Sequence, residues 1–259
     1  MAELLARTSA GRLDLVSVRP AKAERVEGAP TSTTSIDAYL DHLAWAMQPG
    51  DLTVGTSVTT GSIPEAIASH ATEAGADVIV IATHSRSRAQ RLVRRNTAIA
   101  VVRATKLPVL ILRPTDAWTS RHTAFRKLLV SLDGSAGAEE VLPFARIIAH
   151  RFGSALVLLT IPEAESEVPR LEHYLESVAA ALRNIGLAAE TRVTGSEAGR
   201  TISGVAESEG CDLIMMATRG RGAPEESDVE VGSVAEHVVE SAHCPVIAIA
   251  VRGLARAPR

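Results

Sequence analysis

The stretch GCDLIMMAT at residues 210–218 decides the fold, because a related stretch, GADVIVIAT, stands at residues 75–83. The two are offset by 135 residues, since 210 − 75 = 135. After its aspartate, each stretch is an uncharged and strongly apolar run. Such runs are typical of strands buried on both faces of a parallel sheet. A repeat period this long indicates duplication of a whole domain rather than a solenoid.

Further matches extend the repeat over most of the chain. The proline-centred match is offset by 137 residues, because 245 − 108 = 137, so the second copy carries two extra residues before it. We expect domains at residues 1–117 and 122–252, joined by a loop-like linker at 113–124. The matching pairs are 39–40 with 174–175, 60–62 with 194–196, and 107–109 with 244–246.

The second copy alternates predicted strands with predicted amphipathic helices. This order predicts a parallel sheet that is covered on both faces. The expected fold class is therefore α/β, with two tandem Rossmann-like, doubly wound parallel-sheet domains. The strands are predicted at 127–132, 155–161, 187–194, 213–217 and 246–251, and the helices at 138–150, 170–185, 198–209 and 234–241.

Composition narrows the classes of function. Hydrophobic residues make up 46% of the 259 residues but aromatic residues only 3%, which predicts an aliphatic core. A net charge of −3 disfavours nucleic acid and anionic lipid as partners. Cys211 and Cys244 stand among apolar residues and are predicted to be buried, reduced thiols. With no apolar run long enough for a membrane span, we expect a cytoplasmic protein.

Two motifs in the second copy carry a family resemblance. One is the strand-and-turn LVSLDGS at residues 129–135, and the other is ATRG at 217–220 followed by GSVA at 232–235. Together they resemble the universal stress protein family, in which a strand ends in Asp-Gly-Ser and a glycine loop precedes a helix that opens with Gly-Ser. The resemblance implies tandem domains of the adenine nucleotide alpha hydrolase-like fold. In one branch of the family it also implies ATP, with Mg²⁺ accompanying the nucleotide.

The first copy lacks a counterpart of the strand at 127–132, which predicts that the first domain is truncated at its N-terminus. Its remaining strands are predicted at 13–18, 78–82 and 109–112, with a helix at 36–47. In the family's strand order the missing strand is central, and its loss exposes two rows of backbone hydrogen-bonding groups. Three explanations stay open: a misassigned start, which we favour, a strand from elsewhere that fills the gap, or a degenerate domain.

The candidate nucleotide site lies at the carboxyl edge of the second sheet, where open α/β sheets bind ligands. Asp133 would accept hydrogen bonds from the adenine amino group or the ribose, and Ile161 would line the base. A glycine loop and a helix N-terminus favour phosphate. Ser233 is also predicted to cap that helix, with Glu236 completing a capping box. The predicted nucleotide-binding residues are Asp133, Ile161, Ala217, Gly220, Gly232 and Ser233; no catalytic residue and no metal ligand is predicted.

Several departures from the family pattern argue against this site. Ala217 replaces the first loop glycine, and the spacer at residues 221–231 has eleven residues instead of nine. Four carboxylates in that spacer would repel a triphosphate. The equivalent loop of the first copy keeps no glycine, so we expect no site there. That loop carries a basic run, which either binds a phosphate-bearing ligand or an acidic partner, or faces solvent or pairs with carboxylates of the neighbouring domain. The spacer acids are Glu225, Glu226, Asp228 and Glu230, and the basic run is Arg86, Arg88, Arg91, Arg94 and Arg95.

Three functions remain open from the sequence. The first is a stress-response module that binds a nucleotide or a partner and signals by occupancy. The second is a slow ATPase, and the third is an interaction protein whose nucleotide site has decayed. The resemblance implies that the final strands, 107–112 and 245–251, pair antiparallel within the chain. A homodimer and a protein partner of unknown identity stay open.

Overall fold

The computed structural model describes residues 1–20, 33–47, 50–83, 97–113, 125–218 and 231–251. Contacts divide the chain into two compact units, Met1–Ala76 and Asp77–Arg259. The division falls ahead of the last two strands of the first repeat, which belong to the second unit. Within the described ranges, no helix is both long enough and apolar enough to cross a membrane.

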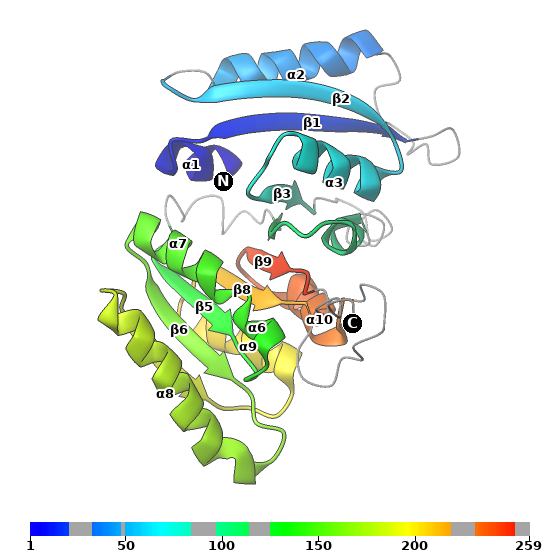
Figure 1. The fold of residues 1–259 in the computed structure, drawn as a ribbon. Coiled ribbons are helices and arrows are strands. Elements are labelled where there is room, and N and C mark those ends of the chain that lie inside the picture. Colours follow the sequence, from blue (N-terminus) through cyan, green and yellow to red (C-terminus); the bar gives the residue numbers. More distant parts are fainter. Residues whose placement is uncertain (21–32, 48–49, 84–96, 114–124, 219–230, 252–259) are drawn as a thin grey trace, which may run out of the picture. The chain divides into compact units, whose positions relative to one another are not determined.

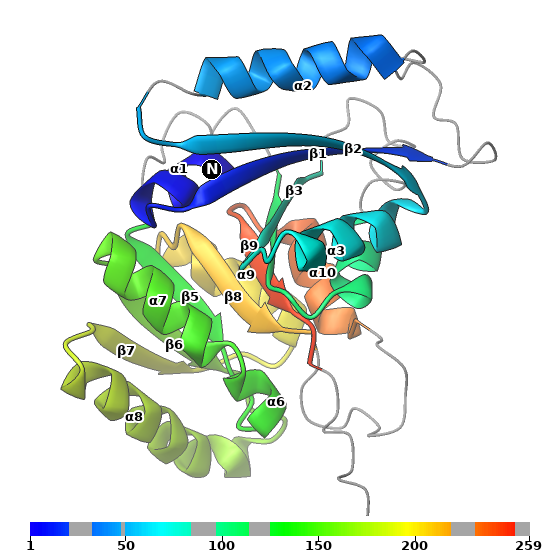
Figure 2. The same ribbon diagram turned by 45° about the horizontal axis from the view of Figure 1, so that its top comes forward.

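A seven-stranded sheet in the order β3-β4-β9-β8-β5-β6-β7 forms the centre of the second unit (Figures 1 and 2). Adjacent strands are parallel except for β4 and β9. The α/β class and the parallel sheet are therefore as predicted. The strands are β3 (Ile79–Ala82), β4 (Val109–Leu112), β5 (Lys127–Ser131), β6 (Ala155–Thr160), β7 (Ala189–Val193), β8 (Leu213–Ala217) and β9 (Val246–Ile249).

Helices cover both faces of this sheet, with α7 and α8 on one face and α9 and α10 on the other (Figures 1 and 2). The single helix predicted at 138–150 is wrong, because the segment forms two helices. Pro143 stands in the first turn of the second, where its missing N–H and its ring prevent a continuous helix. The helices are α6 (Ala136–Glu139), α7 (Leu142–Phe152), α8 (Val168–Asn184), α9 (Ala198–Ser208) and α10 (Ser233–Ser241), with a short 3₁₀ turn, η1, at Glu165–Glu167.

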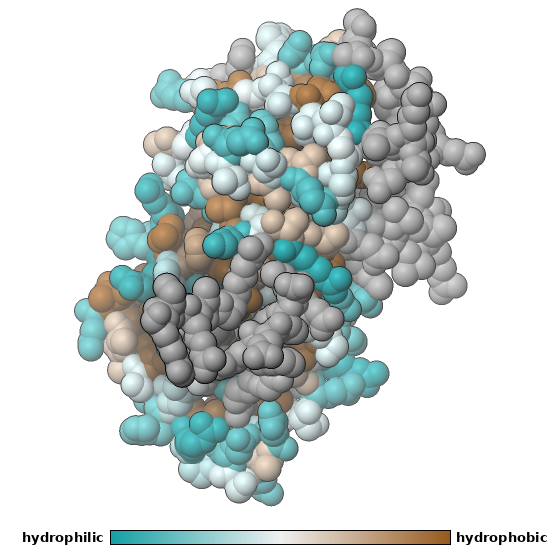
Figure 3. Space-filling view, turned by 45° about the vertical axis from the view of Figure 1, so that its right-hand side comes forward, coloured by the Kyte–Doolittle hydropathy of each residue, from teal (hydrophilic) through white to brown (hydrophobic). Residues whose placement is uncertain are grey.

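The core of the second unit is aliphatic, as its composition predicts. Leu128, Leu129 and Val130 on β5 have no exposed surface, and burying each such side chain stabilises the fold by about 1.5–3 kcal/mol. Two buried hydroxyls in this core, those of Ser154 and Thr160, are bonded to backbone carbonyls. The Ser154 hydroxyl, for example, donates to the Phe125 carbonyl over 2.6 Å. Hydrophilic residues lie over much of the coloured surface that Figure 3 draws.

The final strands of the two repeats pair antiparallel, which confirms that prediction. Val109, Leu110 and Ile111 stand opposite Ala248, Ile247 and Val246, and all six side chains are buried. A salt bridge of 3.2 Å between Arg103 and Glu236 also joins the two repeats. The end of the first repeat is therefore built into the sheet of the second.

The first unit contains the rest of the first repeat around a two-stranded parallel sheet. Within the described ranges, β1 pairs with β2 alone and β3 pairs with β4 alone. Their counterparts in the second repeat, β6 and β8, both pair with β5. Among the described residues the expected strand is thus absent, and β1 and β3 each have one edge without the partner strand that their counterparts have. The elements are α1 (Ala2–Thr8), β1 (Arg12–Pro20), α2 (Thr33–Met47), β2 (Thr53–Gly61) and α3 (Ile63–Glu73).

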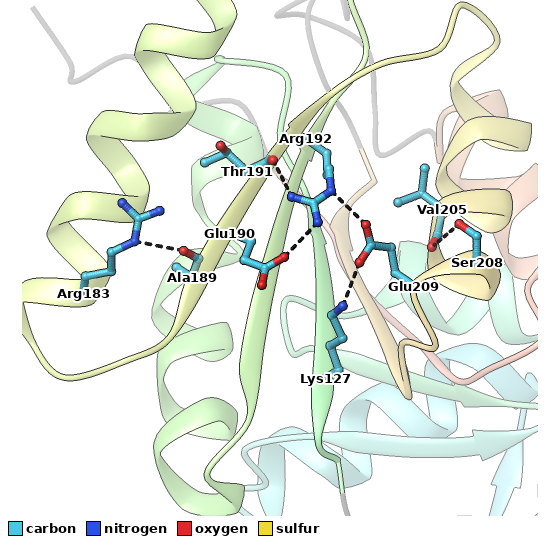
Figure 4. Close-up of polar contacts among 9 residues, drawn as sticks. All are labelled: Lys127, Arg183, Ala189, Glu190, Thr191, Arg192, Val205, Ser208 and Glu209. Atoms are coloured by element: carbon cyan, nitrogen blue, oxygen red, sulfur yellow. Dashed lines mark hydrogen bonds and ion pairs between the residues drawn. The ribbon is translucent and has the colours of Figure 1, made fainter.

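A network of charged side chains joins β5, β7 and the end of α9 (Figure 4). Glu209 accepts hydrogen bonds from Lys127 Nζ at 2.7 Å and from Arg192 Nε at 2.8 Å. Arg192 also contacts Glu190 Oε2 at 2.8 Å. The hydrogen bonds from Lys127 and Arg192 hold the pKa of Glu209 below its ordinary value. The network is partly exposed, so its contribution to stability is modest.

Glu209→Gln is expected to lower the free energy of unfolding at pH 7 by at most about 1 kcal/mol. Because the folded pKa of Glu209 is depressed, its contribution is present above the unfolded pKa and is lost as pH falls through the folded pKa. Urea unfolding from pH 7 down to pH 3 should therefore show the wild-type advantage shrinking. Glu176→Gln, which breaks the more exposed pair with Arg183, is the control. If Glu209→Gln lowered the free energy of unfolding by the same amount at pH 7 and at pH 3, the lowered pKa of Glu209 would be contradicted.

Both cysteines are buried, as predicted. Burial raises the pKa of the Cys211 thiol to about 11 and that of the Cys244 thiol to about 12. Because the thiolate is the reactive species, native protein at pH 8 should react with a thiol reagent at least tenfold more slowly than unfolded protein. Equal rates for native and urea-unfolded protein would show that the thiols are accessible.

Candidate functional site

Three strand ends meet at the carboxyl edge of the second unit's sheet. Ser131 on β5 stands opposite both Leu159 on β6 and Met216 on β8. Asp133, Ile161 and Thr218 each follow this aligned row by two residues. The register therefore brings the predicted base-binding residues, Asp133 and Ile161, to the same edge as the end of β8.

The Asp-Gly-Ser motif builds a tight turn between β5 and α6. Asp133 Oδ1 accepts the N–H of Ser135 over 2.9 Å, while Gly134 has a φ of 81°, which favours glycine. The Ser135 hydroxyl then caps α6 by accepting the N–H of Ala138 at 3.1 Å. The motif thus has a local structural role in addition to the ligand role that was predicted for Asp133.

A tyrosine packs against this turn, and its role was not predicted. Tyr174 donates from its hydroxyl to Glu139 Oε1 over 2.9 Å. Its ring lies 3.9 Å from where a Cβ on Gly134 would stand. Burial, followed by the bond to Glu139, raises the tyrosine pKa above its ordinary value. The sequence analysis used Tyr174 only as one of the residues that match between the two repeats. Its counterpart in the first repeat, Tyr39, is 60% exposed.

The N-terminus of α10 reaches the same edge through Gly232. Its N–H donates to the Thr218 carbonyl at 2.9 Å. A Cβ at Gly232 would stand 3.1 Å from that carbonyl oxygen, so glycine permits the approach. The start of α10 is therefore tied to the end of β8. Its free backbone N–H groups and its dipole favour an anion there.

The predicted capping box at this helix is wrong. Gly232, with an extended φ of −64° and ψ of 152°, is the N-cap, and no side chain caps α10. Ser233 is the first helical residue, and Glu236 bonds to Arg103 instead of reaching back. The reason is that the tertiary bond from Gly232 to β8 sets where the helix begins.

Thr218 carries an unusual hydroxyl. The residue is 1% exposed, and its Oγ1 has no hydrogen-bond partner among the described residues. The backbone N–H of Thr218 donates to Ile249 O, just as Thr83 N–H does to Leu112 O in the first repeat. Yet the Thr83 hydroxyl also donates to Leu112 O, at 3.1 Å. A buried hydroxyl without a partner is costly, so Thr218 is suited to a ligand. Sequence reasoning gave it no role.

Other predicted features fall at different places. Ala217 is buried as the last residue of β8, paired with Ile249. Gly220, the acidic spacer and the basic run of the first copy lie outside the described residues. Ile161 is partly exposed. Among the described residues no cluster of His, Cys, Asp and Glu is suited to a metal ion.

The first unit has a hollow of about 460 Å³ between β2 and α3. Glu65 and Glu73 line it together with Ser62 and His70. A hydrogen bond from Ser62 holds the pKa of Glu65 below its ordinary value, which favours the charged form. This acidic lining disfavours a phosphate-bearing ligand, so the edge of the second unit's sheet is the better candidate for a nucleotide.

Comparison with known proteins agrees with this architecture. The model of the universal stress protein family matches residues 1–113 and again 124–250. A universal stress protein from Archaeoglobus fulgidus DSM 4304 superposes with a TM-score of 0.74 at 18% identity, covering 98% of this chain and 90% of that one. A putative universal stress protein from Pseudomonas aeruginosa UCBPP-PA14 gives 0.69 at 16% identity, covering 96% and 86%. At these identities the structures show the fold alone, whereas the two family matches span most of the sequence. The chain therefore belongs to the universal stress protein family, with two tandem domains of that family.

Proposed function

We propose that this stress protein binds ATP, or a closely related adenine nucleotide, in its second domain and signals by occupancy. The observation that carries the proposal is the buried Thr218 hydroxyl, which has no partner among the described residues. It lies at the end of β8, where the Gly232 N–H bonds to the Thr218 carbonyl. Phosphate groups accept hydrogen bonds, so a phosphate oxygen at this place would satisfy both the hydroxyl and the start of α10.

The register of the sheet supports the other contacts of the proposed site. Asp133 follows β5 and Ile161 follows β6 at the same edge. Asp133 would accept a hydrogen bond from the adenine amino group or the ribose, and Ile161 would line the base. The buried methyl group of Ala217 belongs to strand β8, so the replaced glycine does not by itself argue for a decayed site. Mg²⁺ would enter with the nucleotide, because magnesium in such sites is held largely by phosphates and water.

Thr218→Val tests whether the Thr218 hydroxyl binds the nucleotide, because valine keeps the shape of the threonine side chain and removes its hydroxyl. We expect it to weaken ATP binding about tenfold in titration calorimetry, as the loss of a hydrogen bond to a charged group does. Thr83→Val, the matched change in the first repeat, should leave the affinity unchanged. Equal ATP affinity in the wild type and in Thr218→Val would remove Thr218 from the site.

The same two variants should differ in stability without ligand. Thr218→Val removes a buried hydroxyl that has no partner, so the free energy of unfolding should stay the same or rise. Thr83→Val breaks a hydrogen bond to Leu112 and should lose about 1 kcal/mol. Urea unfolding of the nucleotide-free proteins measures both values. A loss for Thr218→Val as large as that for Thr83→Val would contradict the assignment.

Two further variants test the site as a whole. Asp133→Ala removes the expected contact to the ribose or base, and Gly232→Glu places a carboxylate where phosphate should bind. Each should abolish saturable binding of ATP, and circular dichroism should confirm that the variants are folded. If wild-type protein does not bind ATP at millimolar concentration, the leading function becomes that of an interaction protein whose nucleotide site has decayed.

Slow ATP hydrolysis is the competing function for the same site. We expect binding of ATP without hydrolysis, because we identify no described side chain at this site as a general base that would accept a proton from the attacking water. Purified protein should therefore release phosphate from ATP no faster than buffer does. Release above that background that disappears in Asp133→Ala would establish a slow ATPase instead.

A further inference from the structure

One aspartate organises the start of the central strand β5. Asp212 Oδ2 accepts the N–H of Arg126 at 2.7 Å and that of Lys127 at 3.0 Å. The N–H of Asp212 donates in turn to the Lys127 carbonyl at 2.8 Å. A single residue at the head of β8 thus makes three hydrogen bonds to the incoming strand and fixes its register.

The first repeat carries the same device at Asp77, which heads β3. The local geometry matches: Ile79 N–H donates to Pro108 O at 3.0 Å, and Ile214 N–H donates to Pro245 O at 3.0 Å. The offset of Asp77 from Asp212 is the repeat offset, since 212 − 77 = 135. Asp77 is therefore the structural counterpart of a strand-capping residue.

In the part of the chain that the structure describes, this device is unused. Asp77 is exposed and makes no hydrogen bond to a described residue, and the outer edge of β3 is unpaired. The side chains beside that edge are also incompletely covered. Val80 and Ile81 on β3 are only half-buried, whereas Met215, the counterpart of Val80, has no exposed surface.

We propose that Asp77 and the outer edge of β3 bind an extended aliphatic segment of another polypeptide as a parallel strand. The internal repeat specifies the occupant, because β5 shows what covers this edge in the second copy. In that register, residues 128–131 of β5 stand opposite 213–216 of β8, which correspond to 78–81 in the first repeat. The segment therefore presents two backbone N–H groups to Asp77 and then three aliphatic residues.

The chemistry of recognition follows from this geometry. Main-chain hydrogen bonds along β3 supply affinity, as in other cases of strand addition. The Asp77 carboxylate selects the direction and the starting point of the segment. Basic residues at that point, corresponding to Arg126 and Lys127 at the start of β5, would complement its charge. An open edge with apolar flanks is an aggregation liability, so covering it also protects the fold.

A peptide with the sequence of residues 125–132, FRKLLVSL, is the probe. Labelled with fluorescein, it should bind the full chain saturably in an anisotropy titration. Asp77→Asn should weaken binding about tenfold, since it loses charged hydrogen bonds, while Asp51→Asn, at another exposed aspartate, should not. The same peptide carrying Leu129→Pro should bind at least tenfold more weakly, because proline cannot donate to a strand.

Amide hydrogen exchange locates the bound peptide. Protection of residues 78–82 that depends on peptide and on Asp77 would establish the proposal. Absence of saturable binding, equal binding to Asp77→Asn, or protection confined to β1 would overturn it. Protection of residues 78–82 that rises with protein concentration without peptide would also overturn it, because a second copy of the chain would then be the occupant.

Discussion

The structure depends on the pairing of β5 along both of its edges. A strand inside a parallel sheet leaves no backbone group without a partner only if each neighbour runs beside it in register. Asp212 fixes where β5 starts, and the hydroxyl of Thr160, by donating to Leu132 O at 2.8 Å, fixes where it ends. The same register brings Asp133 and Thr218 to one edge. The strand that completes the core therefore also positions the candidate site.

The first repeat shows what happens without a described counterpart of β5. Its strands belong to two sheets, and Tyr39, the counterpart of half-buried Tyr174, is exposed. The antiparallel pairing of β4 with β9 nevertheless builds the end of this repeat into the sheet of the second. The first domain thus contributes structure to the second unit. Among the described residues, the features on which the proposed nucleotide site rests belong to the second domain.

Much of the fold could be predicted from the sequence, because uncharged apolar runs between turn residues are typical of parallel strands. The predictions were wrong where one residue or one contact overrides the sequence pattern. The helical periodicity at 138–150 predicted one helix, but Pro143 breaks the segment into two. Ser233 has the residue type of an N-cap, but a tertiary bond to β8 gives that role to Gly232. Thr218 and its counterpart in the first repeat are identical in sequence, so only the hydroxyl orientation distinguishes them.

Our central proposal is that ATP binds at the carboxyl edge of the second domain's sheet. Amide hydrogen exchange with and without ATP, read by mass spectrometry, tests it most directly. We predict slower exchange in residues 132–138 and 231–236 when ATP is present, and no change in residues 57–73 around the hollow of the first unit. Unchanged exchange throughout at saturating ATP, or slowing confined to residues 57–73, would contradict it.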